Sequence, residues 1–140
     1  MILVDTNVFS ALMRLDQEPR VISWLDGIEE SILCVSAITL FETQHGLSSL
    51  PPGRRRTGLE EKFTRVLIDV FDSRVVPFDD AAAITAGHVY AHHRSKGRNV
   101  YVPDSQIAGL AIHIHATLAT RNKKDFSGLG LALIDPWSEL

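Results

Sequence analysis

Short apolar runs rich in β-branched residues alternate with amphipathic segments along the chain. The runs predict strands at residues 2–4, 32–35, 74–77, 117–119 and 131–134. The segments between them predict helices at about residues 7–14, 19–26, 36–49, 54–71, 79–94 and 103–114. Because strands separated by helices form parallel sheets, we expect an α/β fold, with a parallel sheet of four to five strands flanked by helices on both faces.

The composition fits one globular domain. The chain has 140 residues, of which 45% are hydrophobic and 22% charged, and we expect a single domain over residues 1–140. The first residues lack the basic region and cleavage site of a signal peptide, so a cytoplasmic protein is expected. A net charge of −3 excludes a chain-wide basic footprint, so nucleic-acid binding would need local basic patches. Cys34 is the single cysteine and is expected to be buried and inert.

Acidic side chains stand where predicted strands end and where helices begin. Asp5 directly follows the first apolar run, and Asp104 lies in the first turn of a predicted helix, where the dipole stabilises negative charge. Glu42 lies in a helix among apolar neighbours, where an unpaired charge is costly to bury. Asn122 and Asp125 follow the fourth predicted strand. Oxygen ligands of this kind select Mg²⁺ or Mn²⁺, so the pattern suggests a site for a hard metal ion.

Other interpretations of the same residues compete with a metal site. Asp5 could serve only as the cap of the following helix. A phosphatase with an aspartyl nucleophile would also place an aspartate at the end of the first strand, but it needs a second aspartate where this sequence has Asn7. The sequence lacks the phosphate-loop, dinucleotide-binding, H-E-x-x-H and G-x-S-x-G motifs, which disfavours the enzymes that depend on them.

The histidines favour structural roles. His88 and His92 are four residues apart, but no third ligand at suitable spacing accompanies them. His113 and His115 are two apart and face different sides of a helix. His115 follows the end of that helix, where we expect the left-handed backbone conformation that histidine tolerates better than most residues.

Taken in order, the motifs resemble the PIN-domain family, and more narrowly its toxin ribonucleases of the VapC and FitB type. They are Leu3–Asn7, Glu42 in its helix, Pro103–Ala108, Ala119–Phe126 and the closing Gly128–Trp137. The resemblance covers essentially the whole chain. It implies a PIN-like domain acting as a Mg²⁺- or Mn²⁺-dependent endoribonuclease, the toxin of a type II toxin–antitoxin module. It also implies a homodimer whose antitoxin occupies the active-site groove, with larger assemblies that bind DNA through the antitoxin.

Carried over residue by residue, the resemblance implies that Asp5 and Asp104 ligate the metal directly. Glu42 would bind it through water or activate that water. Many PIN proteins have an acid two residues after the threonine of the last motif, where this chain has Asn122, with Asp125 three residues further on. Both are catalytic candidates, and we place Asn122 ahead of Asp125 as the residue facing the site. The residues expected to orient Asp5 and its waters are Thr6, Asn7 and Thr120.

A catalytically idle PIN fold that only binds a partner is an alternative, which the three retained acids disfavour. RNA approaching an acidic site needs cationic side chains, and the candidates are Arg121, Lys123, Lys124, Arg94, Lys96 and Arg98. A third basic run, Arg54–Arg56, is more typical of a solvated surface. The helices at residues 19–26 and 36–49 carry more apolar surface than one sheet can cover, so a two-fold dimer is expected.

Overall fold

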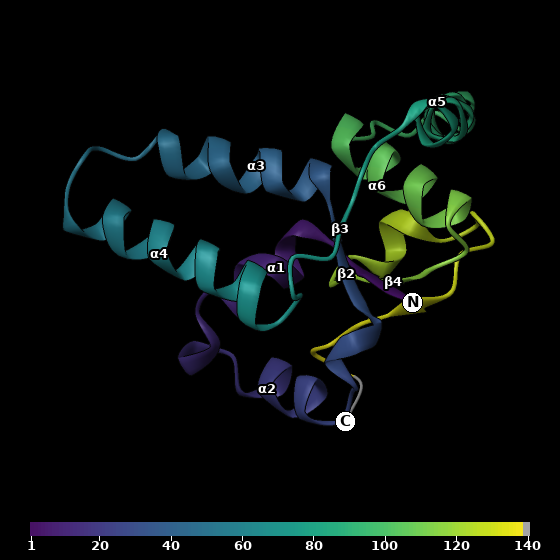
Figure 1. Cartoon of the computed structure of the whole chain (residues 1–140). Coiled ribbons are helices and arrows are strands. Elements are labelled where there is room, and N and C mark those ends of the chain that lie inside the picture. The colour runs from purple at the N-terminus through teal and green to yellow at the C-terminus, as the bar shows by residue number, and fades with distance from the viewer. Residues whose placement is uncertain (139–140) are drawn as a thin grey trace.

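The computed structural model describes residues 1–138 and centres on a five-stranded parallel sheet (Figure 1). The strands are β1 (Ile2–Val4), β2 (Leu33–Ser36), β3 (Val75–Val76), β4 (Thr117–Ala119) and β5 (Leu133–Ile134), in the order β3-β2-β1-β4-β5. The helices are α1 (Thr6–Leu12), α2 (Pro19–Asp26), α3 (Ala37–Ser48), α4 (Arg54–Asp69), α5 (Asp80–Ser95) and α6 (Val102–His113). Residues 1–138 also contain three 3-10 helices: η1 (Leu15–Gln17), η2 (Glu30–Ile32) and η3 (Lys123–Phe126). The predicted fold class is confirmed.

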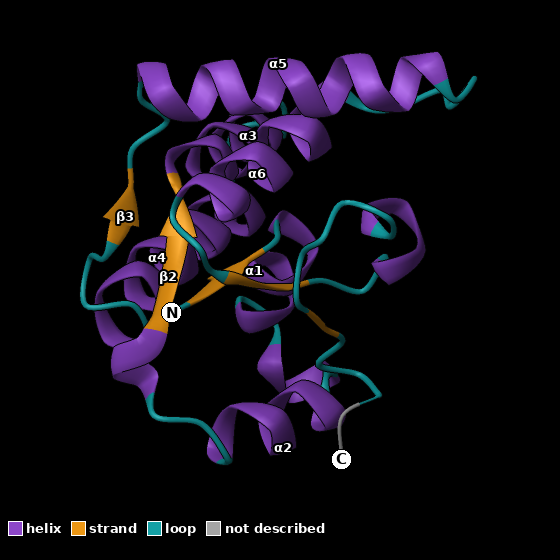
Figure 2. Cartoon of the chain, turned by 90° about the vertical axis from the view of Figure 1, so that its right-hand side faces the viewer, coloured by secondary structure: helices purple, strands orange, loops and turns teal. Residues whose placement is uncertain are grey.

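Alternation along the strands creates two apolar cores, one on each face of the sheet. Ile2 and Val4 of β1 pack with the core that contains residues of α1, α2 and α4, whereas Leu3 packs with the core of α5 and α6. Figure 2 shows α5 running across α6, with α2 at the opposite end of the molecule. Because both faces are covered, β1 is apolar at every position and wholly buried.

Most predicted elements lie within two or three residues of the observed ones. β4 and α2 have the expected bounds, and Pro19 takes the first helical position of α2. α1 begins one residue early, because the Asp5 side chain caps it. β2 begins one residue late, because the 3-10 helix η2 takes up the preceding residues. Helices of three or four residues carry no periodicity, so the sequence did not predict them.

Two further expectations concern single residues. His115 follows α6 with a φ of 55°, which confirms the left-handed cap. Cys34 is buried, and burial raises the pKa of its thiol to about 11, which keeps it protonated and unreactive at neutral pH. Within residues 1–138, none of the helices has the length and apolarity needed to cross a membrane. Residues 139–140 of the expected domain lie outside the described part of the chain.

Helices α5 and α6 approach each other closely at a glycine. A Cβ built on Gly109 of α6 would lie 2.4 Å from Cα and 2.5 Å from the backbone nitrogen of Ala86 in α5. Real Cβ atoms do not approach backbone atoms so closely. The missing side chain therefore sets the distance between α5 and α6, and with it the position of the first turn of α6.

Candidate active site

Three neighbouring strands end in polar residues at the same edge of the sheet. β1 pairs with β2 and β4 so that Val4 lies opposite Val35 and Ala119. The residues that come next are Asp5, Ser36 and Thr120, each nearly inaccessible to solvent. The strand order reverses at β1, and parallel α/β sheets place their ligands outside the carboxyl ends of strands at such a reversal.

The Asp5 side chain is fixed by hydrogen bonds to both of its carboxylate oxygens. One carboxylate oxygen, Oδ1, accepts a hydrogen bond from the Thr6 backbone N–H at 2.8 Å, and Oδ2 accepts one from the Thr120 hydroxyl at 2.7 Å. The side chain is therefore a helix cap and a fixed carboxylate at once. Burial raises the pKa of Asp5, while both hydrogen bonds oppose that rise and the charges of Glu42 and Asp125 add to it.

Glu42 is held by a chain of hydroxyl groups that starts at the end of β2. The Thr6 hydroxyl donates to Glu42 Oε1 at 2.7 Å, which leaves its oxygen to accept from Thr39 at 2.9 Å. The Thr39 hydroxyl in turn accepts from Ser36 Oγ at 3.3 Å. Every hydroxyl in this chain donates in the direction of the carboxylate, so the chain fixes the position of the Glu42 side chain.

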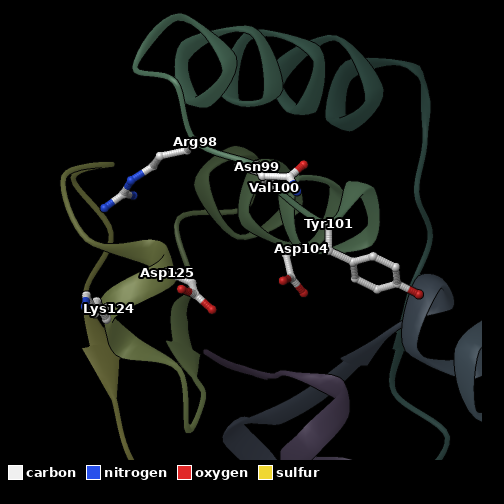
Figure 3. A pocket seen from close by; sticks show the side chains of 7 residues that line it. All are labelled: Arg98, Asn99, Val100, Tyr101, Asp104, Lys124 and Asp125. Carbon is white, nitrogen blue, oxygen red and sulfur yellow. The ribbon is translucent and has the colours of Figure 1, made fainter.

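Asp104 and Asp125 border an open cavity of about 330 Å³. Asp104 lies in the first turn of α6 and Asp125 in η3, and Figure 3 shows both carboxylates directed toward the same space. Burial raises the pKa of Asp104 to about 7, and the charges of Asp5, Glu42 and Asp125 contribute to the shift. Four acids from four segments of the chain therefore interact at one site.

The two candidates for the fourth acid lie differently. Asp125 lines the cavity, and its charge acts on both Asp5 and Asp104. Asn122 is exposed and is not among the residues that line the cavity; its backbone N–H donates to Thr120 Oγ1 at 3.0 Å. Asn7 does not contact Asp5 through a recorded hydrogen bond among the described residues, but its Oδ1 accepts from the Arg121 backbone N–H at 3.4 Å. Asn7 thus joins α1 to the segment that follows β4.

The basic candidates divide into two groups. Arg98 and Lys124 line the cavity beside the acids. Arg121 lies over the Trp137 ring at 4.6 Å from its centroid, and Arg94 lies 6.0 Å from the centroid of the Tyr90 ring. Lys96 and Lys123 are exposed and are not among the residues lining the cavity. The third basic run lies at the start of α4, away from the cavity, where Arg56 pairs with Glu60.

Sequence reasoning did not assign three residues of this region. Thr39 completes the hydroxyl chain, and the spacing Ser36, Thr39, Glu42 along one helix face was a signal for it. Tyr101 lines the cavity, and the signal was an aromatic residue just ahead of the Pro103–Ala108 motif. His93 is buried, with neither ring nitrogen hydrogen-bonded to any described residue, and burial lowers its pKa.

The donor set can be tested for its fit to a hard metal ion. Among residues 1–138, no three acidic, histidine or cysteine side chains are already spaced to hold a metal ion. The chemistry of the donors does fit, because they are carboxylate oxygens whose mutual repulsion helps to raise the pKa of Asp104. Asp104 and Asp125 border open space, so their side chains can rotate toward Asp5 without disturbing the core.

Asp104→Asn is expected to change how the stability of the metal-free protein depends on pH. Folding raises the pKa of Asp104 from its ordinary value of 3.8 to about 7, so ionisation of this carboxyl disfavours the folded state. Its destabilising effect is absent below pH 4, grows between pH 4 and pH 7, and is complete above pH 7. We expect the variant to be more stable than the wild type at pH 8 by roughly 1 kcal/mol, after discounting for solvent screening.

The measurement is urea unfolding of both proteins in chelator at pH 4.5 and pH 8. The advantage of the variant should be small at the lower pH and largest at the higher one. Other titrating groups are common to the two proteins and cancel in the difference. An advantage that is equal at both pH values would contradict the electrostatic interpretation of Asp104.

Fold and site together define the class of protein. Proteins of this class have a parallel sheet flanked by helices, and here the carboxylates lie where the strand order reverses. The chain belongs to the PIN domain family, which matches residues 2–130.

Relatives are similar over nearly their full length. The chain is 33% identical over 137 residues to the VapC ribonuclease Y4jK of Sinorhizobium fredii, covering 98% of each protein. It is 31% identical over 139 residues to the toxin FitB of Neisseria gonorrhoeae, covering 99% of this chain and 100% of the other. The structure of FitAB bound to an IR36 DNA fragment matches with a TM-score of 0.87 at 31% identity, over 100% of this chain and 98% of that one. These names support a nuclease activity.

Proposed function

We propose that this chain is a Mg²⁺- or Mn²⁺-dependent endoribonuclease and the toxin of a type II toxin–antitoxin module. The observation that carries the proposal is the electrostatic coupling of Asp5, Glu42, Asp104 and Asp125 at one site. Asp104 and Asp125 line its cavity together with the cationic side chains of Arg98 and Lys124. Relatives named as a ribonuclease and as a toxin support the same function.

Asp5 and Asp104 would hold the ion directly, with Glu42 and Asp125 beside them; we place Asp125 ahead of Asn122 because it lines the cavity. A bound ion of this kind polarises the scissile phosphate and lowers the pKa of water. The chain supplies the rest of the site. Thr6 and Thr120 fix the orientation of Asp5 through hydrogen bonds to both of its oxygens.

Glu42 is suited to accept a proton from an attacking water, because it is a carboxylate whose position the Thr6 hydroxyl fixes by a hydrogen bond to Oε1. Arg98 and Lys124 would hold the backbone of the RNA against the repulsion of the acids. Arg94, Lys96, Arg121 and Lys123 remain candidates for phosphates further along the strand.

The test is incubation of the purified protein with RNA in Mg²⁺ or Mn²⁺, followed by mapping of the cut ends. Internal cleavage that stops on addition of a chelator supports the proposal. Hydrolysis of small phosphate esters without RNA cleavage would favour a phosphatase. Failure in both assays, with tight binding to a co-encoded protein, would favour an idle PIN fold that acts as a binding module.

This chain has an apolar surface beside the site to which the proposed antitoxin could bind. A groove of about 280 Å³ lies between α1, α3 and α4, and it runs from Glu42 to Leu47, Leu50 and Leu59. An apolar segment of the antitoxin lying in this groove would block access to Glu42. By analogy with the DNA-bound structure of FitAB, we propose that binding to DNA occurs through the antitoxin.

The homodimer remains a prediction that rests on the apolar surface of two helices, and the structure contains both helices as α2 and α3. α2 exposes Ile22, and α3 exposes Phe41 to 72%. Burying these side chains between two copies would remove apolar surface from water. Sedimentation at micromolar concentration should therefore give a species of about twice the 15.5 kDa of one chain. A sedimentation boundary at the mass of one chain would contradict the dimer.

A further inference from the structure

One aromatic ring lies at the mouth of the acidic cavity and is not used by the site described above. Tyr101 precedes α6, lines the cavity, and leaves 62% of its surface exposed. It provides no side-chain hydrogen bond to cap α6, so the helix does not explain its presence. An exposed tyrosine with no packing role is available for a ligand.

The ring of Tyr101 lies beside the acids without pointing at them. Figure 3 shows its hydroxyl directed away from the Asp104 and Asp125 carboxylates, while the ring borders the same cavity. A flat group that stacks on this ring would therefore lie next to the acids. Tyrosine has only two side-chain torsions, so it loses little conformational entropy when a flat group stacks on it.

The cavity has two chemically different sides. In Figure 3, Arg98 and Lys124 lie on one side of the Asp104 and Asp125 carboxylates, and Tyr101 lies on the other. A nucleotide whose phosphate lies at the acids therefore meets cations in one direction and an aromatic face in the other. Among residues 1–138, Tyr101 is the one aromatic side chain that lines this cavity.

We infer that Tyr101 is a base-stacking residue, which holds the nucleobase next to the scissile phosphate of a single-stranded RNA. The inference rests on the proposed ribonuclease function and adds a substrate contact to it. Stacking on an aromatic ring is how single-stranded nucleic acids are commonly held, and every base has a face that can take part. Base stacking on Tyr101 therefore predicts that the RNA is unpaired at the cleavage site.

The test uses a short RNA whose cleavage site has been mapped with the wild-type protein. Two further substrates carry an abasic ribose in place of the base on one or the other side of the cut. We expect the wild type to cleave one abasic substrate about tenfold more slowly, measured as kcat/KM. Tyr101→Ala should cleave the intact RNA about tenfold more slowly and show no additional loss on that abasic substrate, because base and ring act as a pair.

Two variants serve as controls. Tyr101→Phe keeps the ring and should keep the dependence on the base. Tyr90→Ala removes an aromatic ring of α5 that does not line the cavity, and it should leave both rates unchanged. Thermal melting of all variants checks that the fold is intact.

Equal cleavage of intact and abasic RNA by the wild type would overturn the inference while leaving the ribonuclease function in place. A full additional loss in Tyr101→Ala on the abasic substrate would overturn it as well. A third outcome is that cleavage does not depend on the base and that Tyr101→Ala binds a co-encoded protein more weakly than the wild type does. This outcome would overturn base stacking and show that the ring contacts the co-encoded protein. Absence of cleavage by the wild type would refute the ribonuclease itself, which is a separate result.

Discussion

Replacing Asp5 with asparagine is expected to lower RNA cleavage by about a hundredfold or more, with no loss of stability in the metal-free protein. The carboxylate is 3% exposed, and burial together with the charges of Glu42 and Asp125 disfavours its ionised form. A neutral side chain of the same shape removes that cost. The asparagine oxygen can accept from the Thr6 N–H, and its amide can donate to the Thr120 hydroxyl.

We expect the unfolding free energy of Asp5→Asn in chelator to equal or exceed that of the wild type, by up to about 1 kcal/mol. The rise in melting temperature on adding Mg²⁺ or Mn²⁺ should shrink, since a charged ligand is lost. The matched control is Asp79→Asn, because Asp79 also caps a helix through its side chain but lies outside the cavity. Wild-type cleavage rates in Asp5→Asn would show that Asp5 acts as a helix cap alone.

Gly109→Ala is expected to have the largest effect on stability among single-methyl changes. The added Cβ would collide with the backbone of Ala86, which cannot move aside as a flexible side chain can. Overpacking of this kind costs about 1–3 kcal/mol or more, and relieving it would move α5 away from α6. Because Asp104 lies in the first turn of α6, the same shift should also weaken cleavage.

Gly87→Ala is the matched control, since Gly87 follows Ala86 in α5 and a Cβ there meets nothing within 4 Å. Alanine is the better helix former, so this variant should gain about 0.4–1 kcal/mol. Denaturant unfolding of the two variants should therefore give shifts of opposite sign. A Gly109→Ala protein as stable as the wild type would show that the two helices separate at little cost.

Much of the fold could be predicted from the sequence, because the strands are short, apolar and separated by capped helices. Ser36 and Asp79 cap α3 and α5 through their side chains, and the two helices predicted from the sequence begin at these residues. Strand order could not be predicted in the same way, since it depends on pairing between segments as distant as residues 2–4 and 117–119. The close approach of Gly109 to the backbone of Ala86 could not be predicted either, because the two residues lie in different helices.

The acids of the site were named from the sequence, but the contacts that hold them were not all predictable. Asp5 and Asp104 follow recognisable local patterns at a strand end and a helix start. The hydroxyl chain through Thr39 requires α1 and α3 to lie side by side, which no local pattern specifies. The preference between Asn122 and Asp125 likewise depends on the path of η3, a 3-10 helix without a sequence signature.

The central position of β1 bears on when the site is completed during synthesis. β1 leaves the ribosome before its pairing partner β4, which begins at residue 117, and Asp125 follows later still. A nascent chain thus carries Asp5 long before Asp104 and Asp125 have been synthesised. The four acids can meet only after residue 125 has left the ribosome, so a ribosome that stalls before that point releases a fragment without the complete site.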